Sequence, residues 1–118
     1  MKDQLPADHH ADLDFKALVE TLQLLEREEV VLRLSAGKQA RVQVKGVLRF
    51  YDYGDGWGKG FAVGPAGRVL LVEDDFRSAD LWTFEGSEYF SVSIRSGDAA
   101  FALGSPGHLE TDEFRLFP

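Results

Sequence analysis

The chain contains no cysteine in its 118 residues. This absence excludes disulfide bonds, zinc–thiolate sites and thiol nucleophiles, and it is compatible with reducing and oxidising compartments alike. Long apolar runs are lacking as well, since none approaches the length of a membrane-spanning helix. Residues 1–10 show no apolar segment of the kind found in signal peptides. We therefore expect a cytoplasmic protein that does not associate with membranes.

Basic residues are scarce: 13 Lys and Arg stand against 20 Asp and Glu, for a net charge of −7. This balance argues against nucleic-acid binding, which needs cations to displace phosphate counterions. It argues equally against anionic membrane surfaces. Long-range attraction favours a basic protein partner. The same excess of acid also serves solubility, a purpose that needs no partner.

The composition is that of a folded domain, with 44% hydrophobic residues, nine Phe, two Trp and three Tyr. We expect a flexible leader over residues 1–11 and a single α+β domain over 12–118. His9 and His10 beside Asp8 and Asp12 suggest a metal site. Because adjacent histidines on a chain terminus more often have no role, we predict no metal site and no cofactor.

Residues 12–28 are predicted to form a helix. Apolar residues recur there at helical spacing and form one stripe. The stripe consists of Phe15, Leu18, Val19, Leu22 and Leu25. Asp12 and Asp14 occupy the positions of an N-cap and of a favourable partner for the helix dipole. The stripe needs a surface to cover, and the strands that follow provide one.

From residue 29 the apolar pattern has a period of two, which predicts strands. The first hairpin turns at 36–38, and we place Ser35 opposite Gln39 so that apolar residues pair on one face. Gly46 is interpreted as a β-bulge. Residues 68–73 are expected to form a buried strand, and 74–80 a loop or a single helical turn.

Later strands complete the predicted sheet. They are expected at 81–85, 88–95, 99–103 and 114–117, with Gly86-Ser87 at the turn of the first pair. The predicted fold is thus one N-terminal helix packed on a curved antiparallel β-sheet of about six or seven strands. A meander, a partly closed barrel and a sandwich all fit this pattern.

Residues 51–61 are the most informative segment, because glycine occupies every second position from 54 to 60. A phosphate-binding loop is one interpretation, but Tyr53 stands where its first glycine belongs and Gly60 where its hydroxyl residue belongs. The dinucleotide-binding pattern fails too. A calcium loop fails because Val63 replaces the bidentate glutamate. A β-hairpin is the better interpretation.

Asp55-Gly56 is the dipeptide typical of a type I′ turn, and it places the hairpin tip. Almost every cross-strand pair that follows has a physical rationale. The pairs are Asp52 with Lys59, Tyr51 with Gly60, Phe50 with Phe61, Arg49 with Ala62, and Leu48 with Val63. Phe50 and Phe61 then face the core, whereas Tyr51 and Tyr53 face the other way and cover glycines.

Nothing in the chain resembles a nucleophile elbow or a catalytic triad, so we name no catalytic residue and favour a non-enzyme. Aromatic side chains with polar groups are favoured at binding surfaces. The candidate binding residues are Tyr51, Asp52, Tyr53, Asp55, Trp57 and Lys59. We interpret the protein as a small non-catalytic protein-interaction domain, such as an inhibitor or immunity protein that binds a basic partner.

The alternative interpretation is a small-molecule or carbohydrate-binding β-barrel, with or without catalytic activity. It requires a pocket bounded by Tyr51, Asp52, Trp57 and Glu85. The two interpretations differ on whether the aromatic rings of the hairpin lie at the surface or in the interior. The sequence makes no prediction of the oligomeric state.

Overall fold

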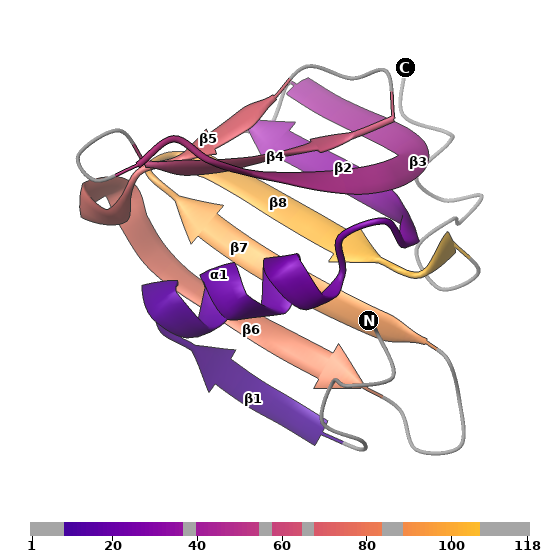
Figure 1. Ribbon diagram of the computed structural model, residues 1–118, viewed down its shortest axis with the longest axis horizontal. Helices are drawn as coiled ribbons and strands as arrows, with labels where there is room; N and C mark the ends of the chain where they lie inside the picture. Colours follow the sequence, from indigo (N-terminus) through magenta and orange to yellow (C-terminus); the bar gives the residue numbers. More distant parts are fainter. Residues whose placement is uncertain (1–8, 37–39, 55–57, 65–67, 84–88, 107–118) are drawn as a thin grey trace.

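The computed structural model describes residues 9–36, 40–54, 58–64, 68–83 and 89–106. They form one α-helix, one 3₁₀ turn and eight strands (Figure 1). The elements are β1 (His9–Leu13), α1 (Phe15–Leu24), β2 (Glu29–Ala36), β3 (Ala40–Asp52), β4 (Lys59–Val63), β5 (Val69–Leu71), η2 (Glu73–Asp75), β6 (Phe76–Thr83), β7 (Phe90–Ser96) and β8 (Ala99–Gly104). The predicted class, one N-terminal helix on an antiparallel sheet, is confirmed.

All eight strands belong to one antiparallel sheet in the order β1-β6-β7-β8-β2-β3-β4-β5. Two meanders, β2 to β5 and β6 to β8, are joined by the pairing of β8 with β2. β1 and β5 are the two edges and do not pair with each other, so the sheet is not closed into a barrel. Strand β1 was not predicted: residues 9–11, expected to belong to a flexible leader, pair with β6.

Helix α1 connects the edge strand β1 to β2 in the interior of the sheet, and it therefore crosses one face of the sheet (Figure 1). It spans residues 15–24 rather than 12–28. Asp14 is the N-cap, and its Oδ1 accepts a hydrogen bond of 2.7 Å from the backbone N–H of Ala17. Asp12 lies in β1 and is not part of the cap, contrary to the prediction.

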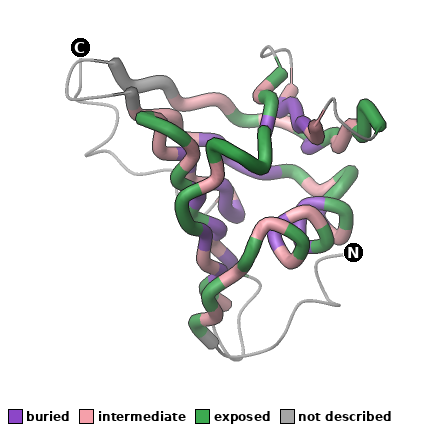
Figure 2. Tube along the Cα trace, turned by 90° about the vertical axis from the view of Figure 1, so that its left-hand side faces the viewer, coloured by how far each residue is buried: buried purple, intermediate pink, exposed green. Residues whose placement is uncertain are grey.

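The core lies between α1 and the face of the sheet that the helix covers (Figure 2). The predicted apolar stripe is confirmed, because Leu18, Leu22 and Leu25 are completely buried. The sheet supplies the other side of the core. Its most buried members are Val30, Leu48, Phe61, Val63, Leu71, Val92, Ile94 and Leu103. The core thus draws on both meanders, and burying its apolar surface holds them together.

The register of the β2–β3 hairpin differs from the prediction by two residues. Leu34 pairs with Val42 instead of Ala40, and Ala36 with Ala40, so the three-residue connection is 37–39. A shift of two keeps every side chain on its own face, because side chains alternate with a period of two. The apolar pattern cannot distinguish such registers, which explains the error.

Strand β3 changes its partner near the middle of its length. Its pairing with β2 ends at Val47, and its pairing with β4 begins at Leu48 (Figure 1). Gly46 lies just before this change and makes no bulge in the β2–β3 register, contrary to the prediction. A Cβ atom at Gly46 would lie 2.5 Å from the Cα of Gly64. Gly46 is therefore required for the close approach of two backbone segments.

Two other differences from prediction concern the middle of the chain. The strand expected to be buried over 68–73 is the short edge strand β5, in which Leu70 is 54% exposed. Strand β6 begins at Phe76, within the segment 74–80 that was expected to be a loop or a helical turn; η2 provides the turn just before it. The predicted strand 114–117 lies outside the described residues. Within the described part of the chain, no helix combines the length and apolar character needed to cross a membrane.

We predict that Gly46→Ala lowers the free energy of unfolding by about 3 kcal/mol, because its new methyl group must push the backbone of Gly64 away. Gly97→Ala is the control. Gly97 has a positive φ of 55°, but its added methyl group would meet no atom within 4 Å, so only about 1 kcal/mol of backbone strain is expected. Urea denaturation measures both. Equal losses for the two variants would contradict a special role for the Gly46–Gly64 approach.

Candidate functional site

The β3–β4 hairpin has the predicted register at all five described pairs, from Leu48–Val63 to Asp52–Lys59. The backbone N–H of Tyr53 donates to the carbonyl of Gly58 over 3.2 Å, which extends the pairing toward the tip. Lys59 Nζ donates to Asp52 Oδ1 over 2.7 Å, so the predicted acid–base pair is confirmed. Asp55 and Trp57, at the predicted tip, lie outside the described residues.

The two tyrosines of the hairpin lie on the outer face of the sheet and not in the core. Phe61, on the opposite face, is completely buried, whereas Tyr53 is 37% exposed and Tyr51 is half-buried. The tyrosine rings stack with centroids 6.2 Å apart and planes 14° from parallel. Asp52 alternates with them and lies on the other side of the strand. The predicted site residues are therefore divided between the two faces of the hairpin.

Glycines provide the space in which the outer side chains pack. A Cβ atom at Gly60 would lie 3.1 Å from Cε2 of Tyr53 and 2.9 Å from the carbonyl oxygen of Val69. Tyr51 is paired with Gly60 as predicted, but the ring that covers this glycine is that of Tyr53, which lies diagonally across from it. A Cβ atom at Gly58 would lie 3.5 Å from Cδ1 of Leu70. The bare backbone of β4 lets these side chains lie flat across the strand.

Three residues of this surface were not predicted: Arg68, Leu70 and Val72. The Arg68 guanidinium lies 4.3 Å from the centre of the Tyr51 ring, and its Nη1 donates to the hydroxyl of Tyr53 over 3.3 Å. That hydrogen bond raises the pKa of Arg68 further above its already high ordinary value. Leu70 and Val72 alternate with the buried Leu71 and therefore lie on the outer face of the sheet, where they are exposed. The apolar run around them reads as a buried strand in the sequence.

We call this surface the aromatic face; it consists of Tyr51, Tyr53, Arg68, Leu70 and Val72. The turn η2 follows directly after Val72, and its three residues, Glu73, Asp74 and Asp75, are all acidic and exposed. The face therefore has an apolar and aromatic centre with negative charge at one margin. Arg68 is held against the tyrosines, and the cation–π contact with Tyr51 restrains both side chains.

The chain was compared with protein-family models, with curated proteins and with solved structures, and no match was found in any of the three.

The pair Asp52–Lys59 leads to a prediction about pH. The hydrogen bond from Lys59, and then that from the backbone N–H of Gly54, lowers the pKa of Asp52 below its ordinary value of 3.8. A folded-state pKa below that of the unfolded chain means that the pair stabilises the fold above pH 3.8. This contribution is lost as the pH falls through the folded-state pKa.

We expect Lys59→Met to raise the pKa of Asp52 back toward 3.8, as followed by NMR titration of its carboxyl carbon. Lys45→Met is the control, because Lys45 lies 3.9 Å from Glu29 and makes no contact with Asp52. An Asp52 pKa that does not change in Lys59→Met would show that the ion pair is absent in solution.

Proposed function

We propose that this protein is a small non-catalytic interaction domain that binds a protein partner through the aromatic face. The observation that carries the proposal is the exposure of neighbouring apolar and aromatic side chains: Leu70 is 54%, Tyr53 37% and Val72 36% accessible. Exposed apolar residues that lie singly need no explanation, but a contiguous group supports an interaction site. Tyrosine and arginine are also the residues that most often dominate binding energy at interfaces.

The order of this surface before binding supports the same proposal. Tyr53 packs over Gly60, and Arg68 contacts both tyrosines. Side chains that are already held in place lose less conformational entropy when a partner binds. Among the described strands β5 is an edge of the sheet beside the face, and partners commonly add a strand to such edges.

Charge supports a basic partner. The acidic turn η2 adjoins Val72 at the margin of the face, and the whole chain has a net charge of −7. Such a distribution attracts a cationic protein over long range and orients it at the margin of the apolar contact. An inhibitor or immunity protein for a basic enzyme is the finer form of this proposal.

The alternative, a small-molecule or carbohydrate-binding barrel, has less support. The sheet keeps two separate edges, β1 and β5, so there is no barrel interior. Tyr51 and Tyr53 lie on an outer face, not around an enclosed cavity. A carbohydrate that stacks on the tyrosine pair is the form of the alternative that these positions allow.

The proposal is tested with affinity-tagged protein and a double variant, Tyr53→Ser with Leu70→Ser. We expect the wild type to retain one stoichiometric protein from the source organism's extract, and the double variant to lose at least tenfold in affinity for that protein once purified. Removing two side chains that become buried in the interface has this effect. Tyr89→Ser is the control, because Tyr89 is 47% exposed but precedes β7 in another part of the fold.

Salt dependence checks the charge argument with the same purified partner. Association should slow as ionic strength rises, because screening weakens long-range attraction. A partner that the double variant binds as well as the wild type does would exclude the aromatic face. A ligand-induced thermal shift from a sugar or metabolite panel, lost in Tyr53→Ser, would support the alternative function instead.

A further inference from the structure

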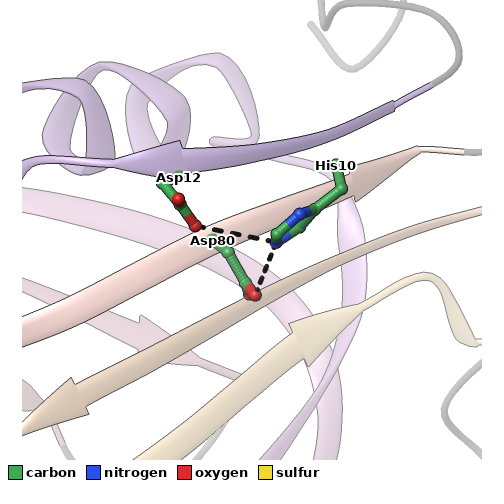
Figure 3. Close-up of side chains that lie close together, drawn as sticks. All are labelled: His10, Asp12 and Asp80. Carbon is green, nitrogen blue, oxygen red and sulfur yellow. Dashed lines mark hydrogen bonds and ion pairs between the residues drawn. The ribbon is translucent and has the colours of Figure 1, made fainter.

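A second cluster of polar side chains lies far from the aromatic face, on strands β1 and β6. The two strands pair with Asp12 opposite Asp80 and His10 opposite Trp82. Side chains two residues apart on a strand point to the same side. Residues 10 and 12 therefore share one side of β1, and residues 80 and 82 share one side of β6. The side chains of His10, Asp12 and Asp80 converge there, away from α1 (Figure 3).

The distances in this cluster suit one metal ion. Nε2 of His10 lies 3.0 Å from Oδ2 of Asp80 and 3.7 Å from Oδ1 of Asp12, and the three ligand atoms all lie within 4.8 Å of one another. A tetrahedral zinc ion, with ligand distances of about 2.0–2.2 Å, holds its donor atoms roughly 3.4 Å apart. Shifts of less than about 1 Å in these partly or fully exposed side chains would therefore complete a three-ligand site.

Asp80 supplies an independent observation. Its Oδ1 is shielded from solvent and has no hydrogen-bond partner, although the side chain as a whole is 29% exposed. A shielded carboxylate oxygen without a partner is costly, and a cation bound to the same carboxylate compensates this cost. Beside it lies a hollow of about 130 Å³, lined by Asp12, Ser78, Ala79, Asp80, Ser93 and Arg95. A metal ion held by three protein ligands would have a fourth coordination position, and the hollow leaves room there for water or an anion.

The face of the His10 imidazole is held in place by a neighbouring ring. It stacks on the indole of Trp82, with ring centroids 4.3 Å apart and planes 24° from parallel. Because this contact uses the ring face, Nε2 remains directed at the carboxylates (Figure 3). A ligand that is already oriented loses little entropy when it binds a metal.

We propose that His10, Asp12 and Asp80 bind a zinc ion, with one nitrogen and two carboxylate oxygens as ligands and the fourth position open. Imidazole with carboxylates is a ligand set that zinc accepts. In the competing explanation, His10 and Asp80 form an ion pair only. The sequence pointed to the histidines but could not reveal the site, because Asp80 lies 70 residues away from His10 and reaches it only through the pairing of β1 with β6.

Isothermal titration of the full chain with Zn²⁺ tests the proposal. We expect one equivalent to bind the wild type, with at least a tenfold weaker affinity in His10→Gln and in Asp80→Asn. His9→Gln is the matched control, since it removes a neighbouring imidazole that is not a ligand in this proposal, and its affinity should equal that of the wild type. Circular dichroism in the presence of a chelator checks that each variant folds.

Trp82 gives a second measurement at the site itself. In a Trp57→Phe background Trp82 is the only tryptophan of the chain, and Co²⁺, a paramagnetic substitute for zinc, should quench its fluorescence with saturation at one equivalent. Asp80→Asn should abolish this quenching. The proposal is overturned if the wild type does not bind zinc, if His10→Gln or Asp80→Asn binds zinc with the wild-type affinity, or if His9→Gln loses affinity as these variants do. It is also overturned if saturating Co²⁺ leaves the emission of Trp82 unchanged.

Discussion

The close approach of Gly46 to Gly64 is the constraint on which the rest of the fold depends. At this point β3 ends its pairing with β2 and begins its pairing with β4, and a side chain at Gly46 would collide with backbone atoms. The change of partner lets one long strand serve both parts of the sheet. It also places Leu48, Phe61 and Val63 in the same core as the helix residues Leu18 and Leu22. Without this change of partner, β4 and β5 would not add their apolar side chains to the shared core.

The core lies on one face of the sheet, and on the other face the described residues near the two edges include exposed side chains such as Tyr53, Leu70 and Trp82. The residues that carry the two proposals all lie on that outer face, toward opposite edges of the strand order: Tyr51, Tyr53 and Leu70 on or beside β3 and β5, and His10 and Asp80 on β1 and β6. Edge strands are where backbone groups and side chains remain accessible. The separation also means that the proposed zinc site and the proposed partner surface can be altered independently.

Both surfaces owe their order to contacts between side chains from different strands, across β4 in the aromatic face and between the neighbours β1 and β6 in the other. Arg68, just before β5, holds the tyrosines of the hairpin, and Trp82 of β6 holds His10 of β1. In each case a planar group lies against the face of a ring, which restrains the orientation of both side chains. A surface of this kind is already arranged before it meets a ligand, and this lowers the entropic cost of binding.

Local pattern determined the helix stripe, the alternation of the strands and the register of the β3–β4 hairpin. In that hairpin almost every pair from Leu48–Val63 to Asp52–Lys59 joins side chains that suit each other. It did not determine the β2–β3 register, since a shift by two residues preserves each face. Strand β1 was not predicted because His9–Leu13 has no strong apolar alternation. Its partners in β6 also lie some 70 positions away in the chain. The exposure of Leu70 and the meeting of His10 with Asp80 were decided by the tertiary structure alone. The first follows from which face of the sheet the core covers and the second from which strands become neighbours, and both result from burying one core shared by the two meanders.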